Sequence, residues 1–209
     1  MNHLKSVDFL IFDLGNVIID IDYQRSLNHI KSLVSNNLHP RVDGFYLTDF
    51  HKDYEKGKID SKSFRRQVNE YFEQNWSDTE VDFLWNSLLG NIPASRIELI
   101  NKLKSKFQIG ILSNTNAIHI DAVNDMLQRD FGLQSFHHIA DHVFYSHEMG
   151  LAKPQHEIYQ TMLNELKTQG DKVVFFDDLE ANVLGAKACG IEAIQVTGPE
   201  VIFDYFKHV

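Results

Sequence analysis

Asp13 stands where the apolar segment 7–12 gives way to Gly15 and Asn16, at the point where a buried strand would end. A carboxylate in such a place can act as a nucleophile, bind a metal ion or simply cap the following turn. The glycine allows nearby main-chain amides to turn inward as an anion-binding nest, which makes Asn16 a candidate substrate-binding residue. On its own, this segment leaves all of these roles open.

Two polar residues, Ser113 and Asn114, end a second apolar segment, 109–112. A hydroxyl and an amide at a strand end, just before a predicted helix, can donate hydrogen bonds to phosphate oxygens. The same residue types are favoured at helix N-termini, so capping of the following helix is the alternative interpretation.

A lysine and a pair of carboxylates provide charges of both signs. Lys153 precedes Pro154 in a loop, where its ammonium could neutralise a transferring phosphoryl group, although an isolated lysine is usually a solvated surface charge. Asp177 and Asp178 follow the apolar segment 173–176 and repel each other unless a cation or hydrogen-bond donors compensate. A hard cation such as Mg²⁺ would meet that need.

The segments that precede these groups have the composition of buried strands. Short runs rich in β-branched and aromatic residues predict five strands, at 8–12, 108–112, 142–145, 172–176 and 193–196. Helical spacing appears between them, as in Ile97, Ile100 and Leu103. This alternation predicts an α/β fold with a doubly wound, Rossmann-like parallel sheet in three αβα layers. Because ligands bind at the carboxyl ends of such strands, we expect the four polar strand ends to meet.

The long segment between the first two predicted strands has a different character. Residues 22–89 contain helical patterns and no convincing strand, with a potential helix cap at Asp60 and a capping box that begins at Ser77. We predict a small helical cap domain over these residues, placed where it can cover the site. The core domain would then comprise residues 1–21 and 90–209.

Several other residues have both functional and structural interpretations. Phe45, His51 and Tyr54 of the insertion could contact a substrate, but aromatic residues in a helical cap mostly form its own core. Asp20 and Asp22 could lie near the mouth of the site, and we expect them to cap or to be solvated. Four histidines lie close together without the spacing of a zinc site, and we expect surface or core positions for them: His137, His138, His142 and His147.

Composition narrows the class of protein. A chain of 209 residues with 43% hydrophobic content can bury one sizeable core, and its net charge of -9 argues against nonspecific nucleic-acid or anionic-membrane binding. The single Cys189 excludes an internal disulfide, and no apolar stretch approaches the ~20 residues of a membrane span. We therefore expect a cytoplasmic protein that acts on a small molecule.

The order Asp, Ser-Asn, Lys, Asp-Asp is far more specific than any one segment. With a helical insertion between the first two motifs, the chain from Asp13 to Gly190 resembles the haloacid dehalogenase-like hydrolase superfamily. Within that superfamily, the segments 12–17, 112–116 and 176–178 are similar to those of the sugar-1-phosphatase branch, which includes bacterial α-glucose-1-phosphatases.

The resemblance implies a Mg²⁺-dependent phosphatase of small phosphorylated metabolites that works through an aspartyl-phosphate intermediate. It makes Asp13 the nucleophile and gives Lys153 the role of neutralising charge on the phosphate and on Asp13. Phosphoryl oxygens would be held by Ser113 and Asn114. The resemblance also implies a metal site, in which Asp13, the Gly15 carbonyl and Asp178 would bind Mg²⁺. Asp177 and Asn182 would orient the groups around the ion.

One position departs from the superfamily pattern. The usual phosphatase of this group has a second aspartate two residues after the nucleophile, which serves as general acid and base, and here that position is Gly15. Such proton transfer is typically worth ~100-fold to 10,000-fold in rate. A sugar 1-phosphate, with a better leaving group than a simple alcohol, is consistent with this loss, and acyl or aryl phosphates would fit equally well. A metal-free 2-haloacid hydrolase and a noncatalytic binding or regulatory protein are the alternatives.

Overall fold

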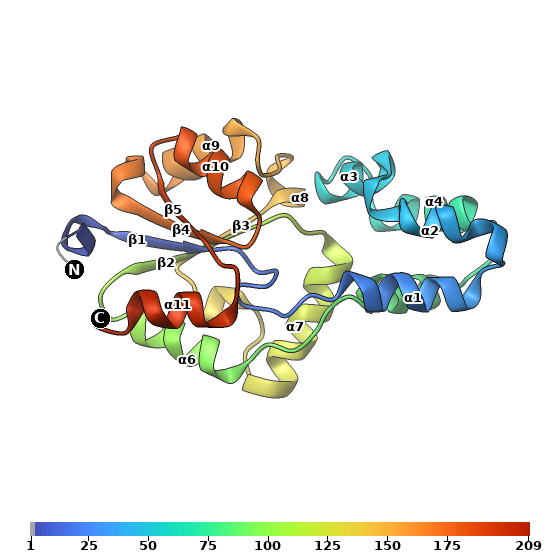
Figure 1. The fold of residues 1–209 in the computed structure, drawn as a ribbon, viewed down its shortest axis with the longest axis horizontal. Coiled ribbons are helices and arrows are strands. Elements are labelled where there is room, and N and C mark those ends of the chain that lie inside the picture. The colour runs from blue at the N-terminus through green and yellow to red at the C-terminus, as the bar shows by residue number, and fades with distance from the viewer. Residues whose placement is uncertain (1–2) are drawn as a thin grey trace.

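The computed structural model describes residues 3–209 and contains a five-stranded, fully parallel sheet at its centre (Figure 1). The strand order is β3-β2-β1-β4-β5, so the chain winds outward from β1 in both directions. This confirms the predicted α/β class and the doubly wound sheet, and each strand lies within one residue of its predicted range. The strands are β1 (Phe9–Phe12), β2 (Gln108–Ser113), β3 (His142–Tyr145), β4 (Val173–Asp177) and β5 (Glu192–Gln195).

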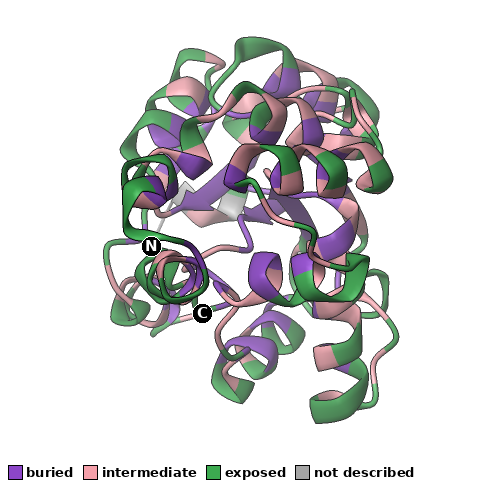
Figure 2. Ribbon diagram, turned by 90° about the vertical axis from the view of Figure 1, so that its right-hand side faces the viewer, coloured by how far each residue is buried: buried purple, intermediate pink, exposed green. Residues whose placement is uncertain are grey.

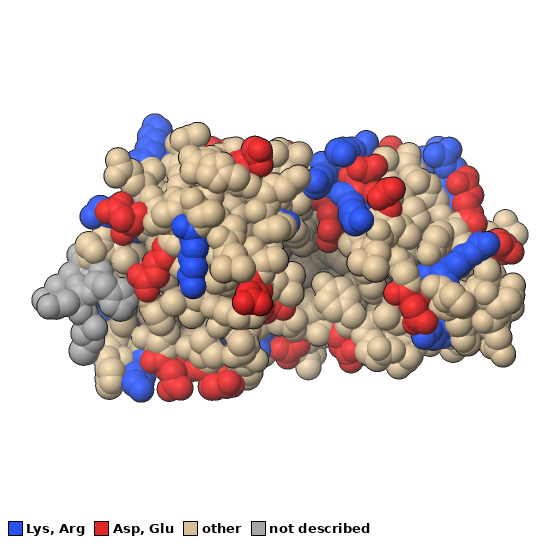
Figure 3. Space-filling view, turned by 45° about the horizontal axis from the view of Figure 1, so that its top comes forward, with Lys and Arg blue, Asp and Glu red and all other residues tan. Residues whose placement is uncertain are grey.

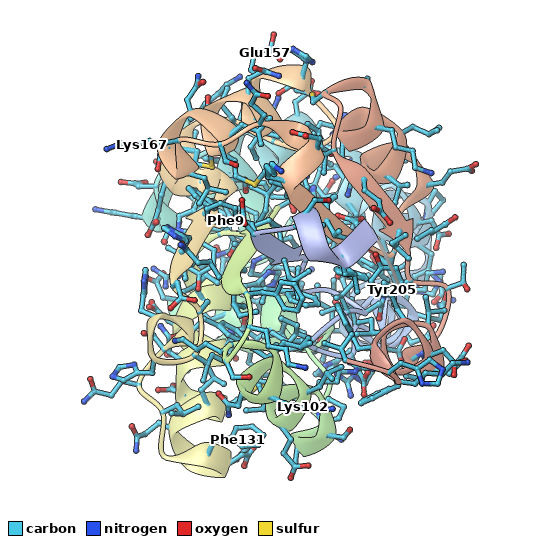
Figure 4. The ribbon with its side chains drawn as sticks, turned by 90° about the vertical axis from the view of Figure 1, so that its left-hand side faces the viewer. Phe9, Lys102, Phe131, Glu157, Lys167 and Tyr205 are labelled. Carbon is cyan, nitrogen blue, oxygen red and sulfur yellow. The ribbon has the colours of Figure 1, made fainter. Side chains whose placement is uncertain are left out.

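Helices cover both faces of the sheet, with α9 and α10 on one side and α6, α7 and α11 on the other (Figure 1). Figure 2 shows the buried strands between these two layers. In Figure 4, which views the end opposite α1 to α5, Phe9 lies in the sheet layer while Glu157 and Lys167 lie at the outer surface. The core helices are α6 (Ala94–Leu103), α7 (Ala117–Phe131), α8 (Ser146–Met149), α9 (His156–Leu166), α10 (Glu180–Ala188) and α11 (Pro199–Phe206).

The central strand β1 is apolar on both faces because each face packs against a helical layer. Leu10 and Phe12 belong to the cluster under α6, α7 and α11, whereas Phe9 and Ile11 belong to the cluster under α9 and α10. Side chains alternate across a strand, so the continuous apolar run that predicted this element follows from double-sided burial. The residue that follows it, Asp13, comes out at the carboxyl edge of the sheet.

Between β1 and β2, the five α-helices that precede α6 form a separate layer with its own apolar core, built around Trp85, Phe45 and Phe64 (Figure 1). We call α1 to α5 the cap helices. Asp60 and Ser77 make the predicted N-terminal caps, and the Ser77 capping box is complete. The cap helices are α1 (Tyr23–Leu33), α2 (His39–Asp43), α3 (Asp49–Glu55), α4 (Ser61–Phe72) and α5 (Asp78–Asn86).

The exact division of the chain into a 22–89 cap domain and a core domain remains a prediction. The two segments that connect the cap helices to the core lie side by side and are joined by hydrogen bonds, such as the one from Gly90 N to Asp20 O at 2.7 Å. Among the described residues, no helix combines the length and the apolar character needed to cross a membrane.

The cap helices also touch the core at the end of α3. Gly57 has φ +63°, and a Cβ built on it would lie 2.0 Å from the carbonyl oxygen of His147. Just before it, the Ser146 hydroxyl donates to the carbonyl of Glu55 at 2.6 Å. Only a glycine permits this close backbone approach, so Gly57 sets how α3 meets the core.

We expect Gly57→Ala to destabilise the protein more than Gly132→Ala does. Gly132 has φ +68°, and a Cβ at that position would meet nothing within 4 Å, so its substitution carries only the left-handed backbone cost of about 1 kcal/mol. At Gly57 the collision with His147 adds at least about 1 kcal/mol. Urea denaturation of the two variants measures the difference, and equal free energies of unfolding would contradict the close contact.

Candidate active site

Asp13 lies at the carboxyl edge of the sheet, on the strand between β2 and β4. Its main-chain N–H donates to the Phe176 carbonyl at 2.8 Å, which extends the β1–β4 pairing by one residue and places Asp13 level with Asp177. The residue is only 7% exposed. Its Oδ1 lies 2.9 Å from the Lys153 ammonium, yet no donor among the described residues is aligned to hydrogen-bond it. A buried carboxylate oxygen is therefore available to a ligand.

Lys153 is the only buried lysine among the described residues, and three acceptors surround its ammonium. It donates to the Leu112 carbonyl at 2.8 Å and to Asp177 Oδ2 at 2.6 Å, and it pairs with Asp13. The charges of Asp13 and Asp177 outweigh burial and raise the pKa of Lys153. The ammonium therefore stays charged and links the ends of β1, β2 and β4.

Asn114 holds the backbone of Lys153 with both ends of its side chain. The amide nitrogen donates to the Lys153 carbonyl, and the amide oxygen accepts from the Lys153 N–H, each at 2.9 Å. The phosphate-binding role predicted for Asn114 stays a prediction: the residue lines the pocket, and its amide nitrogen, which uses one N–H on Lys153, has a second one to donate. Ser113, the last residue of β2, is buried and lines the same pocket.

The two adjacent aspartates have different environments. Asp177 is fully buried, and both of its oxygens accept hydrogen bonds, from Lys153, from the Asn182 amide and from the Leu179 N–H. Asp178 is partly exposed and accepts one bond, at 2.9 Å from Asn16 Nδ2. Asp177 is thus an anchor for its neighbours, and Asp178 keeps oxygen atoms free for a ligand.

Ligand atoms of Asp13, Asp177 and Asp178 lie within 4.8 Å of one another, close enough to share a cation. Burial, opposed by Lys153 and reinforced by the charge of Asp177, raises the pKa of Asp13 to about 6. Partial burial also raises the pKa of Asp178, although its bond from Asn16 acts against the shift. The raised pKa values show that the ionised forms of these clustered carboxylates are disfavoured. Carboxylate oxygens are the ligands that a hard divalent cation prefers, so such a cation would stabilise the ionised forms.

A pocket of about 290 Å³ opens above these residues, between the core and the cap helices. Figure 3 shows the surface hollowed at this boundary. Of the site residues that the sequence predicts, only Asp177 does not line the pocket, because it lies beneath the others. The lining includes Asp13, Gly15, Asn16, Ser113, Asn114, Lys153, Asp178 and Asn182.

The roof of the pocket carries residues that the sequence motifs did not identify. Tyr23, Trp85 and Glu55 come from the cap helices, and His119 comes from α7. Tyr46 comes from the short 3₁₀ helix Phe45–Leu47 between α2 and α3. The strand-end rule that located the floor does not apply to helices, so no comparable signal marked these positions.

The structure also decides between the functional and structural interpretations of several single residues. Phe45 and Tyr54 are buried in the core of the cap helices as expected, but His51 from the same helical layer lines the pocket. Asp22 caps α1, accepting from Arg25 N at 2.9 Å, and Asp20 pairs with the buried Arg96 at 2.8 Å.

A capped, doubly wound α/β fold with a buried aspartate, a buried lysine and an acidic strand end defines a class of hydrolases. The chain belongs to the haloacid dehalogenase-like hydrolase family, whose model matches residues 7–190. That match covers most of the sequence and confirms the family resemblance of its motifs.

Individual relatives agree with this membership. The chain is 23% identical to the D-ribitol-5-phosphate phosphatase of Bacteroides thetaiotaomicron, covering 89% of this chain and 90% of the relative. It is 25% identical to a phosphorylated carbohydrates phosphatase of Thermotoga maritima, covering 90% of this chain and 84% of the relative.

Solved structures give the same result. A haloacid dehalogenase family enzyme of Bacteroides thetaiotaomicron, crystallised with magnesium and inorganic phosphate, superimposes with a TM-score of 0.82 at 30% identity, covering 90% of this chain and 93% of that one. The L-2-haloacid dehalogenase of Xanthobacter autotrophicus has a TM-score of 0.60 at 16% identity, covering 91% and 77%, a likeness of fold alone.

We expect Lys153→Met to lower the free energy of unfolding by about 3–5 kcal/mol at pH 7, because two buried carboxylates lose their counter-charge. Lys153 lowers the pKa of Asp13, so without this lysine burial raises the pKa of Asp13 further in the folded state. The folded protein then binds protons more readily than the unfolded chain, so the deficit relative to wild type should shrink as the pH falls from 7 to 5.

Lys104→Met is the matched control, since Lys104 pairs with Asp141 at 3.3 Å where both side chains are about one-third exposed. That loss should stay within about 1 kcal/mol. Urea denaturation at both pH values measures all three proteins. A Lys153→Met deficit no larger than that of the control would contradict the role of the buried ammonium.

Proposed function

We propose that this protein is a Mg²⁺-dependent phosphatase that hydrolyses a small phosphorylated metabolite through an aspartyl-phosphate on Asp13. The observation that carries the proposal is the buried Asp13–Lys153 ion pair of 2.9 Å on the floor of a closed-over pocket, with Asp178 beside it. Family membership supports it, and so do relatives named as phosphatases of phosphorylated carbohydrates and of D-ribitol 5-phosphate.

The residues of the floor divide the work of phosphoryl transfer. With a pKa of about 6, Asp13 is ionised at neutral pH and can attack phosphorus, forming the aspartyl-phosphate as the bond to the leaving oxygen breaks. The Lys153 ammonium stabilises charge on the phosphoryl oxygens, and the Ser113 hydroxyl would donate to one of them. Water then displaces Asp13 from phosphorus, releasing inorganic phosphate.

The donor set fits a magnesium ion. Asp13 Oδ1 is buried without an aligned donor, and Asp178 has oxygen capacity left, whereas both oxygens of Asp177 are already used. Asp13, the Gly15 carbonyl and Asp178 would therefore hold the ion, with Asp177 and Asn182 fixing the surrounding groups. When bound, Mg²⁺ supplies the positive charge that a phosphate needs to enter an acidic pocket.

The net charge of the pocket lining also supports the need for a bound cation. Its described lining holds three carboxyl groups but only the Lys153 ammonium to oppose them. Burial lowers the pKa of His51 to about 4 and that of His119 to about 3, so neither ring adds positive charge at neutral pH. A phosphate dianion would be repelled from this site without a cation.

We further propose that the organic part of the substrate is a sugar or a polyol. Tyr23 and Tyr46 meet edge to face at 5.0 Å, and Trp85 stacks on His119 at 4.7 Å, so aromatic surfaces line the roof. Such rings pack against the C–H faces of carbohydrates, while nearby polar groups bind hydroxyls. A sugar 1-phosphate, the substrate of the branch that the motifs resemble, is one member of this class.

We expect Asp13→Asn to abolish phosphate release without unfolding the protein. Because burial disfavours the Asp13 carboxylate, a neutral amide should leave the melting temperature unchanged or higher. A panel of sugar, polyol and aryl phosphates with Mg²⁺, assayed for inorganic phosphate, measures activity. Turnover equal to that of the wild type would exclude Asp13 as the nucleophile.

Magnesium should raise the melting temperature of the wild type at pH 7.5 and much less at pH 5. The pKa of Asp13 is raised to about 6, so protons compete with the ion below that pH. Asp178→Asn should remove most of the shift, whereas Asp204→Asn, at an exposed position of α11, should keep it. Equal shifts in both variants would place the metal elsewhere.

A further inference from the structure

The proposed reaction needs a proton for the leaving oxygen, and Gly15 cannot supply it. Of the other ionisable side chains that line the pocket, most are unsuited to the task. His119 is held between Asn116 and the Trp85 carbonyl, at 3.0 and 3.2 Å, and is neutral. Burial raises the pKa of Tyr23 and of Tyr46, the latter to about 12, so these hydroxyls keep their protons.

Glu55 is the remaining carboxyl of the lining outside the metal-binding set. Glu55 is the last residue of α3. It lines the pocket, and 25% of its side-chain surface is exposed. His51 Nε2 lies 3.5 Å from the Glu55 carboxylate, but burial lowers the pKa of His51 to about 4, so its ring is neutral at pH 7. Within the described part of the chain, no strong ion pair holds this carboxyl away from the cavity.

The backbone of Glu55 is fixed to the catalytic floor. Ser146 Oγ lies 2.6 Å from the Glu55 carbonyl and 3.0 Å from the Thr115 carbonyl, and it accepts from the Thr115 N–H at 2.9 Å. Thr115 follows Ser113 and Asn114 at the end of β2. With the Gly57 contact to His147, this serine holds the end of α3 over the strand ends that carry the reaction.

The charges around Glu55 favour a proton on it. Burial, followed by the negative charge of Asp13, raises the pKa of Glu55 to about 7, while Lys153 and Lys56 lower it. The titratable and charged groups that face it are Asp13 and Lys153 of the floor, Tyr23 of α1, and His51 and Lys56 at α3. From α8, Ser146 meets the Glu55 carbonyl, and the main chain of His147 meets Gly57. Most enzymes place a general acid near the operating pH, and Glu55 meets that condition.

We propose that Glu55 is the general acid and base of this site and performs from the cap helices the task that Gly15 cannot. This inference rests on the proposed phosphatase function. As Asp13 bonds to phosphorus and the bond to the leaving oxygen breaks, the Glu55 carboxyl gives its proton to that oxygen, which departs as an alcohol. The Glu55 carboxylate then takes a proton from the water that attacks the aspartyl-phosphate, so inorganic phosphate leaves and both carboxyl groups return to their starting states.

The leaving group distinguishes proton donation from other roles. Glu55→Gln should lower kcat/KM for a polyol or sugar phosphate by ~100-fold or more, because an alkoxide leaves poorly without a proton. It should lower kcat/KM for p-nitrophenyl phosphate by less than ~5-fold, since p-nitrophenolate needs no acid. An equal loss on both substrates, or no loss on either, would overturn the proposal.

Asp53→Asn is the matched control, as Asp53 lies on the same helix, pairs with Lys58 at 3.0 Å and is absent from the pocket lining. It should leave both activities unchanged. Melting temperatures of both variants check that the fold is intact. If the wild type hydrolyses no phosphate ester with Mg²⁺, the proposed function fails; if it does and Glu55→Gln behaves like Asp53→Asn, only the Glu55 inference fails.

A second variant moves the acid back to the floor. A Cβ at Gly15 would lie 3.4 Å from Ile21 and 3.8 Å from Asp13 Oδ2, both ordinary contact distances, and Gly15 does not have a positive φ, so the backbone accepts a side chain next to Asp13. We expect Gly15→Asp combined with Glu55→Gln to regain at least ~10-fold on the polyol phosphate, within the range of general acid catalysis. No gain on that substrate would contradict the need for a proton donor.

The pH profile gives an independent measurement. In the wild type, kcat/KM for the polyol phosphate should fall as the pH rises above about 7, where Glu55 loses its proton. The profile for p-nitrophenyl phosphate should lack that limb, and so should both profiles of Glu55→Gln. An alkaline limb that persists unchanged in Glu55→Gln would assign the proton to another group.

Discussion

The buried ammonium of Lys153 is the constraint on which the site depends. Three strand ends bring a main-chain carbonyl and two carboxylates to one point, and they can remain there only because a single cation meets all three. Asn114 fixes the lysine backbone, and Asn182 and the Leu179 N–H complete the coordination of Asp177. The parallel sheet brings the strand ends together, and the Lys153 ammonium offsets the repulsion between the carboxylates of Asp13 and Asp177.

The same arrangement leaves negative charge unbalanced, and that imbalance is useful. Asp13 and Asp178 retain oxygen capacity, and their raised pKa values record the free energy stored by holding carboxylates in a poorly solvated cavity. A divalent cation held by Asp13 and Asp178 would offset this unfavourable free energy and supply positive charge for a phosphate. The clustered carboxylates of Asp13 and Asp178 therefore lower the stability of the fold while they favour the binding of a cation.

The cap helices contribute more than cover. Their aromatic core fixes the roof, while Ser146 and Gly57 join the end of α3 to the core. Through Ser146, these contacts hold Glu55 close to the end of β2, although the two segments lie far apart in the sequence. Residues of the core and of the cap helices therefore line one pocket, which is the basis for assigning the cap a part in the proposed mechanism.

The sequence by itself determined the sheet, the helical insertion and most of the floor, from Asp13 through Lys153 to Asp178. Parallel strands buried on both faces are continuous apolar runs, and their carboxyl ends must meet, so local patterns were sufficient. Only the tertiary structure decided that Asn114 holds Lys153, that His51 faces the pocket, and that Glu55 lines the same pocket as Gly15. The direction in which a cap helix points its side chains depends on how two layers dock, and packing between distant segments leaves no periodic signal in either one.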